Sequence, residues 1–171
     1  MTRPALEDAA PGQETYIDLV PEDDVLSAME RQSSVTQRIL ASIDAAKASY
    51  RYAPAKWSVK ELVGHLADAE RVMGYRALAV ARGETRPLPA FDEDVYVRNA
   101  GFDAWTIGDL AEQYALVRRS TIVLLCNLPE SAWERHGIAN DHPVSVRAIA
   151  FGIVGHERHH LAILRERYAV S

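Results

Sequence analysis

The chain has 171 residues, of which 48% are hydrophobic and 25% are charged, and it contains a single cysteine. This composition is typical of one globular domain that builds its core without disulfides, and the net charge of −5 disfavours binding to nucleic acid or anionic membranes. No apolar run is long enough to span a membrane and the start lacks a signal-peptide stretch, so we expect a cytoplasmic protein.

The first segment, residues 1–21, contains scattered prolines and acids without an apolar period. We interpret it as an arm that leads into the domain of residues 22–171 and packs late or not at all. Acidic residues then begin a predicted first helix over 23–47, in which apolar residues recur at helical spacing.

A second helix is predicted from Ser58, because Ser58 and Glu61 have the spacing of a capping box. It should run to about Ala81, before Gly83 stops it. The following segment is rich in proline and lacks regular structure, and residues 91–98 form either a short helix or a strand.

A third helix is predicted from a cap at Thr106 to about Asn127. Cys126 lies in its apolar run, which favours a buried, unreactive thiol. Residues 133–141 are turn-rich and form one short strand or an extended loop. Pro143 precedes the last helix, which should end near Tyr168.

Four long amphipathic helices with few strand signals predict an all-α four-helix bundle. The long connection between helices two and three allows a crossover rather than a simple meander.

Histidine is unevenly placed, since three of the six histidines fall within five residues. His156 and His160 are four residues apart and share the inward stripe of the last helix, so both should point into the bundle. Two buried imidazoles need two sets of partners, and one metal ion satisfies both. His159 lies on the flank, where a surface position or a contact with a ligand residue is favoured over metal binding. His136 and His142 belong to the polar loop, which leaves them solvated unless that loop covers the site.

A third ligand should come from a facing helix, and His65 lies on the apolar side of helix two. The alternative is an ordinary core or surface histidine. Three histidines with an open coordination position are typical of a catalytic metal site rather than a closed structural one.

Three motifs resemble the DinB/YfiT-like superfamily of metal-binding four-helix bundles. They are W-S-V-K-E-L-V-G-H-L-A-D over 57–68, F-D-E-D over 91–94 and H-E-R-H-H over 156–160, and the resemblance covers about 23–168. It implies a divalent metal held by the same three histidines, His65, His156 and His160.

The resemblance also implies an activity and an assembly. Family members include thiol-dependent S-transferases and isomerases that use low-molecular-weight thiols, others are called metal-dependent hydrolases, and many are dimers. Glu70 stands where the YfiT-like pattern H-x-x-D-x-H has its second histidine. Because many family members are dimers and act on small molecules, the resemblance implies that this chain is a homodimer with a small-molecule substrate.

The leading hypothesis is an enzyme in which Zn²⁺ or Ni²⁺ acidifies water or a low-molecular-weight thiol, giving a hydrolase or a thiol S-transferase. Asp68, one turn past His65, would accept a proton from a ligand imidazole or from water, or is simply a solvated helix acid. Glu157 follows a ligand directly, so it should face away from the site or reach its rim. The main alternative is a noncatalytic, metal-binding, stress-related dimeric bundle.

Three further residues are candidates for substrate binding. Arg76 lies on nearly the same face as His65 and would meet an anionic substrate, unless it forms a salt bridge instead. Trp57 and Tyr96 would wall the pocket, although buried aromatic residues more often belong to the core.

Overall fold

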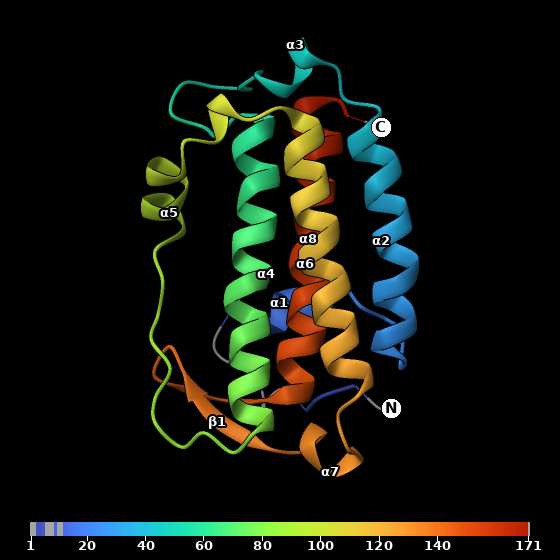
Figure 1. Ribbon diagram of the computed structural model, residues 1–171, viewed down its shortest axis with the longest axis vertical. Helices are drawn as coiled ribbons and strands as arrows, with labels where there is room; N and C mark the ends of the chain where they lie inside the picture. Colours follow the sequence, from blue (N-terminus) through green and yellow to red (C-terminus); the bar gives the residue numbers. More distant parts are fainter. Residues whose placement is uncertain (1–2, 6–8, 10–11, 171) are drawn as a thin grey trace.

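A computed structural model describes residues 3–5, 9 and 12–170 of the chain (Figure 1). The elements in chain order are α1 (Glu14–Ile17), α2 (Val25–Ala41), α3 (Ala45–Ala48), α4 (Val59–Ala81), α5 (Glu93–Ala100), the short 3₁₀ helix η2 (Phe102–Ala104), α6 (Ile107–Cys126), α7 (Glu130–Trp133), β1 (His136–Ala139), β2 (His142–Ser145) and α8 (Val146–Tyr168).

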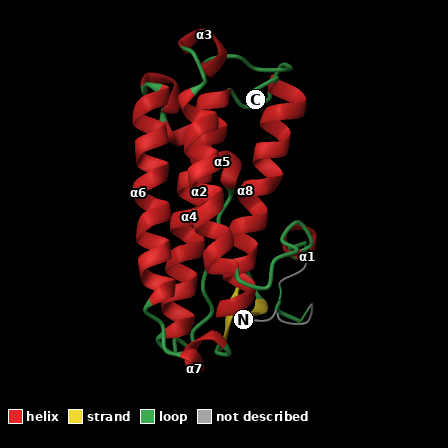
Figure 2. Cartoon of the chain, turned by 90° about the vertical axis from the view of Figure 1, so that its right-hand side faces the viewer, coloured by secondary structure: helices red, strands yellow, loops and turns green. Residues whose placement is uncertain are grey.

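Four long helices, α2, α4, α6 and α8, lie side by side and form the bundle (Figures 1 and 2). Helix α4 packs against α6 and α8, and α2 packs against the same two helices. The predicted helical bundle is therefore confirmed. The connection from α4 to α6 carries α5 and η2 along the outside of α4, back to the end of the bundle where α4 begins (Figure 1).

Local sequence signals set the beginnings of the two central helices. The Ser58 hydroxyl accepts a bond from the Glu61 backbone N–H, and the Glu61 carboxylate accepts one from the Ser58 N–H. Thr106 and Asp109 form the same reciprocal pair at the start of α6. Each pair satisfies backbone donors that a helix leaves without internal partners, so both helices begin where the sequence predicts.

Three segments differ from the predicted elements. The expected helix over 23–47 is two helices, because α2 ends at Ala41 and the Asp44 side chain caps the separate α3. The segment between α7 and α8 is a hairpin of two antiparallel strands. Its turn has Asn140 and Asp141 at φ 54° and 63°, a conformation that these two residue types tolerate. Pro143 lies in β2, so the last helix begins later, at Val146.

Residues 14–20 of the N-terminal arm pack against the bundle, so the expectation that the arm does not pack at all is wrong for this segment. Helix α1 lies against α8 (Figure 2), with Ile17 and Val20 1% and 0% exposed. An added Cβ at Gly155 would overlap the backbone of Tyr16, so this close approach requires glycine. Arg158 fastens the arm by donating to the Leu19 carbonyl at 2.7 Å.

The core consists of two apolar clusters with a polar layer between them. Along α8 the first cluster ends at Val154 and the second begins at Leu161. The side chains in between are buried and polar, and come from all four long helices: Gln32, Thr36, His65, Glu70, Arg118, His156, Glu157 and His160. The polar and ionisable side chains of this layer therefore lie inside the core of the bundle.

Cys126 is exposed, so the expectation of a buried thiol is wrong. It is the last residue of α6, and the inward positions there are taken by Ile122 and Leu125. Among the described residues, no helix is long and apolar enough to cross a membrane.

Candidate metal centre and adjoining pocket

Three histidine side chains from two helices meet inside the bundle. The Nε2 atom of His156 lies 3.1 Å from Nε2 of His65 and 3.1 Å from Nε2 of His160. The three side chains are buried, and each offers one nitrogen within 4.8 Å of the others. The structure thus brings together the three residues that the sequence selects.

Helical geometry explains this convergence. His156 and His160 are one turn apart on α8, and both occupy the buried side of that helix. His65 projects from the facing side of α4, where the Trp57 ring packs over it at a centroid distance of 4.7 Å. The indole Nε1 of Trp57 donates to Asp94 Oδ1 at 3.1 Å, which fixes the ring in place.

Burial keeps these imidazoles neutral. It lowers the pKa of His65 from 6.5 to about 4, and burial together with the neighbouring His65 lowers the pKa of His156 to about 3. The pKa of His160 is also lowered, first by burial and then by the neighbouring His156. Neutral imidazole is the form that binds a metal ion, because the ligand nitrogen must carry a free electron pair.

The donor set fits a divalent transition metal. Nitrogen ligands about 2.0–2.1 Å from a tetrahedral Zn²⁺ lie about 3.3 Å from one another, close to the separations of 3.1 Å found here. Hydrogen bonds alone do not explain this arrangement well. The Nε2 atom of His156 faces two other Nε2 atoms, and in a neutral ring it can be either a donor or an acceptor but not both. Nδ1 of His160 is buried without a hydrogen-bond partner, so nothing in the described structure fixes the tautomer of that ring.

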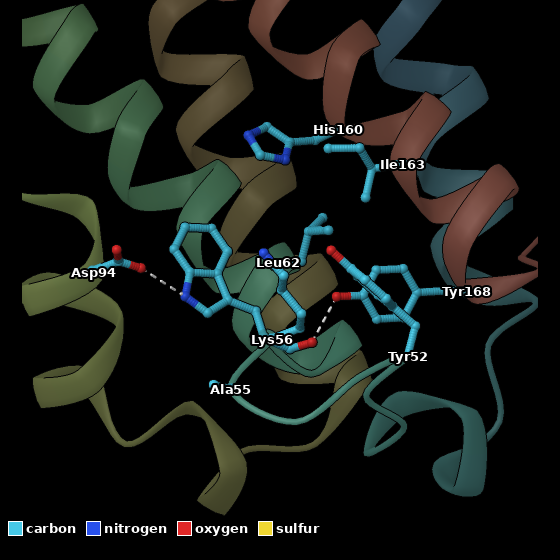
Figure 3. A pocket seen from close by; sticks show the side chains of 9 residues that line it. Tyr52, Ala55, Lys56, Leu62, Asp94, His160, Ile163 and Tyr168 are labelled. Atoms are coloured by element: carbon cyan, nitrogen blue, oxygen red, sulfur yellow. Dashed lines mark hydrogen bonds between the residues drawn. The ribbon is translucent and has the colours of Figure 1, made fainter.

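A pocket of about 290 Å³ adjoins the histidine cluster (Figure 3). The His160 ring closes one end, and Leu62 and Ile163 supply apolar wall. Tyr52 and Tyr168 stand opposite Asp94. The remaining lining residues are Ala55, Lys56 and Trp57. A small molecule in this pocket would therefore lie between aromatic rings and next to the cluster.

The other predicted site residues are placed as follows. Trp57 lines the histidine pocket. Asp68 is half-buried, its pKa is raised by burial, and its carboxylate accepts a hydrogen bond from Arg71 at 3.1 Å rather than from a histidine. Arg76 and Tyr96 line a different pocket that shares no residue with the first, since Arg76 is eleven residues from His65, about 16 Å along the helix. The structure therefore does not bring these two residues to the histidine cluster.

Glu157 does not reach the rim of the site, which was one of the two positions expected from the sequence, but is buried in the bundle. It is 1% exposed and accepts a bond from Arg118 at 2.7 Å. Arg118 also donates to both carboxylate oxygens of Glu70, at 2.8 to 3.0 Å. Tyr114, Thr36 and Gln32 complete the hydrogen bonds to Glu157. Glu70 and Glu157 are thus held in a buried ion network next to the histidines.

Several residues near the cluster were missed from the sequence. The Tyr16 ring packs edge-on against His156 and the exposed His159, at centroid distances of 5.4 and 5.5 Å. Burial, with a smaller contribution from Glu93, raises the pKa of Tyr16. No periodicity in the arm predicts the contact of Tyr16 with His156. For Asp94, in contrast, the sequence does offer a signal, because this residue is part of the F-D-E-D motif.

His136 and His142 lie on the β-hairpin, outside the histidine cluster.

Comparison with known families and structures agrees with this architecture. The profile of the DinB superfamily matches residues 28–164. The chain belongs to the DinB superfamily. Among curated proteins, no sequence matches this chain.

Solved structures share the fold at low sequence identity. YfiT from Bacillus subtilis, described as a probable metal-dependent hydrolase with an unusual four-helix bundle topology, has a TM-score of 0.75 and 17% identity, covering 99% of this chain and 94% of its own. A mycothiol-dependent maleylpyruvate isomerase has a TM-score of 0.67 and 16% identity, covering 86% of this chain and 62% of its own. The DinB-like protein YjoA from Bacillus subtilis has a TM-score of 0.58 and 23% identity, with 85% and 90% covered.

Proposed function

We propose that this DinB-superfamily protein is a divalent-metal-dependent enzyme whose metal, Zn²⁺ or Ni²⁺, is held by His65, His156 and His160. The observation that carries the proposal is the convergence of three buried, neutral Nε2 atoms on one point. Three protein ligands leave at least one coordination position for a reactant, which is the arrangement of catalytic sites. A divalent ion in such a site supplies Lewis acidity, lowering the pKa of bound water to about 7 or of a bound thiol further.

The residues of the chain would bind and orient the reactant. Tyr52 and Tyr168 give the pocket aromatic walls, and the Tyr168 hydroxyl is held in place by donating to the Trp57 carbonyl at 2.6 Å. The three histidine side chains are buried, so bulk water has little access to them. The connection over 82–106 is, in this proposal, the crossover of the bundle, and it contributes Asp94 to the lining of the pocket.

Two reactions are consistent with this site, hydrolysis and thiol S-transfer. The relatives support both, since YfiT is described as a probable metal-dependent hydrolase and another relative as a mycothiol-dependent isomerase. We infer a cytoplasmic homodimer that takes a small-molecule substrate, with a low-molecular-weight thiol as co-substrate in the second case. We do not expect binding to nucleic acid, because the net charge is −5.

The test combines metal analysis with a turnover screen. The purified protein should contain close to one Zn²⁺ or Ni²⁺ per chain, and His65→Ala should lose both the metal and the turnover while remaining folded. His159→Ala is the matched control, because His159 is an exposed histidine on α8, next to the ligand His160, and its loss should leave both unchanged. The screen uses esters and amides alone, then electrophiles with mycothiol, bacillithiol, glutathione or coenzyme A.

The outcomes separate the alternatives. Turnover without thiol indicates a hydrolase, and turnover that requires a thiol indicates an S-transferase. Metal binding without any turnover indicates the noncatalytic metal-binding bundle, and a protein with no affinity for either ion contradicts the proposal altogether.

A further inference from the structure

The chain has a second pocket, between α4 and the segment that leads into α5. Its volume is about 270 Å³, and it shares no lining residue with the histidine pocket. Arg76 is its buried charge, with Val72, Leu88, Phe91 and Tyr96 as its main apolar surfaces. Arg71 also lines the pocket, but it is partly exposed and pairs with Asp68. The pocket is therefore largely apolar, and Arg76 is the one buried guanidinium group in its wall.

The two buried arginines of the described chain differ in their charged partners. Arg118 is 1% exposed and binds two carboxylates. Arg76 is 9% exposed, yet its hydrogen bond within the described chain goes to the Pro89 carbonyl, at 2.7 Å, and no carboxylate pairs with it. Burying a cation without an anionic partner is unfavourable, and in keeping with this, burial alone lowers the Arg76 pKa.

The groups around Arg76 indicate which kind of ligand would pair with its guanidinium group. A guanidinium group carries five N–H donors in one plane and suits the two oxygens of a carboxylate, whereas the Pro89 carbonyl occupies a single donor. The Phe91 ring stands 5.9 Å from the guanidinium carbon and packs edge-on against Tyr96 at 5.3 Å. Aromatic and aliphatic walls favour a ligand with an apolar, flat body over a strongly hydrated inorganic anion.

We propose that this second pocket binds a small organic carboxylate, with its carboxylate on Arg76 and its apolar body against Leu88, Phe91 and Tyr96. The volume lies just below the range of about 300–1,000 Å³ for pockets that hold drug-sized ligands, which limits the ligand to a small molecule. The site is about 16 Å along α4 from His65, so it needs neither the metal nor the proposed reaction.

The test is a titration of the full-length protein with phenylacetate, followed by nuclear magnetic resonance at the Arg76 Nε–H and the amides of residues 88–96. We expect saturable shifts at these positions, with phenylacetamide, the neutral analogue, binding at least about tenfold more weakly. Inorganic phosphate should cause no comparable shift. No saturable shift with phenylacetate, or equal binding of phenylacetamide or phosphate, would overturn the proposal.

Variants separate anion binding from a purely structural role of Arg76 in holding Pro89. Arg76→Gln should weaken phenylacetate binding about tenfold or more, while Arg82→Gln, at an exposed arginine directly after the same helix, should not change it. Tyr96→Ala removes no contact of Arg76, whose hydrogen bond to Pro89 and approach to the Phe91 ring both involve other residues, and it should still weaken binding severalfold. Unchanged affinity in both Arg76→Gln and Tyr96→Ala would show that the pocket does not bind the ligand.

Discussion

At the scale of single residues, the polar groups of the core are coupled to one another. Arg118 neutralises Glu70 and Glu157, and Glu157 follows directly after His156 on α8. Removing one partner from a buried ion pair leaves the others charged and without compensation, which destabilises much more than losing the whole group. The position of α8, which carries His156 and His160, therefore depends on Arg118, a residue that is not itself a member of the histidine cluster.

The first prediction concerns this arginine. Arg118→Met should lower the free energy of unfolding by about 3–5 kcal/mol, because it leaves two buried carboxylates without their counter-ion. Arg71→Met is the control, since it breaks only the partly exposed pair with Asp68 and should change stability by about 1 kcal/mol or less. Urea unfolding followed by circular dichroism measures both. Equal losses in the two variants would mean that the buried network contributes little.

Residue-level prediction from the sequence succeeded where helical spacing alone fixes direction. His156 and His160 share a face on any regular helix, and the capping box fixes the start of the helix that presents His65. Arg118 was within reach of the same reasoning, since it follows Tyr114 by four residues on the inward stripe of α6. Its acidic partners come from other helices, and no spacing within one helix reveals them.

At the scale of elements, the short helix α1 is stable only because it is docked. Four residues are too few to form a helix alone in water, so its structure depends on burying Ile17 against the bundle. The docking brings Tyr16 against His156. This contact could not be predicted from the sequence, because it depends on tertiary packing and on a glycine whose purpose appears only when the facing backbone is known.

The second prediction tests this docking. Gly155→Ala should displace α1, because the new methyl group would overlap the Tyr16 backbone. The displacement should appear as faster amide hydrogen exchange and proteolysis over residues 14–20. Gly152→Ala is the matched control on the same helix, since its nearest outside atom would be 3.9 Å away. It should keep the arm docked and raise stability by roughly 0.5–1 kcal/mol. Equal protection of the arm in both variants would contradict the close approach.

Other element boundaries were set by capping and turn chemistry. The break between α2 and α3 was missed because apolar spacing continues across it, while the Asp44 cap that restarts the helix resembles an ordinary polar position. The hairpin was only half predicted, because a two-residue Asn-Asp turn is a weak signal beside the surrounding polar residues.

At the scale of the whole molecule, the polar layer divides one bundle into two apolar halves. Burying this layer is favourable only while every charge in it has a partner and every histidine stays neutral. The ion network meets the first condition through Arg118. The second condition depends on pH, so the stability of the metal-free protein should depend on pH as well.

The third prediction gives the sign of this dependence. The His65 pKa is about 4 in the folded protein, against 6.5 for a solvent-exposed histidine in the unfolded chain, so between these pH values the unfolded state binds the extra proton. The stability contributed by neutral His65 is therefore complete above pH 6.5 and is lost as the pH falls towards 4. At about 1.4 kcal/mol per pKa unit, His65 alone accounts for a loss on the order of 3 kcal/mol, and His156 acts in the same direction.

Urea unfolding of the metal-free protein at about pH 7 and about pH 4.5 measures this loss. His65→Leu should lose clearly less stability between the two pH values than the wild type, because it removes a group that must take up a proton on unfolding. His159→Leu, an exposed histidine on the same helix as two members of the cluster, should keep the wild-type dependence. If His65→Leu and the wild type lose the same stability on acidification, the buried histidines do not control the acid sensitivity of the bundle.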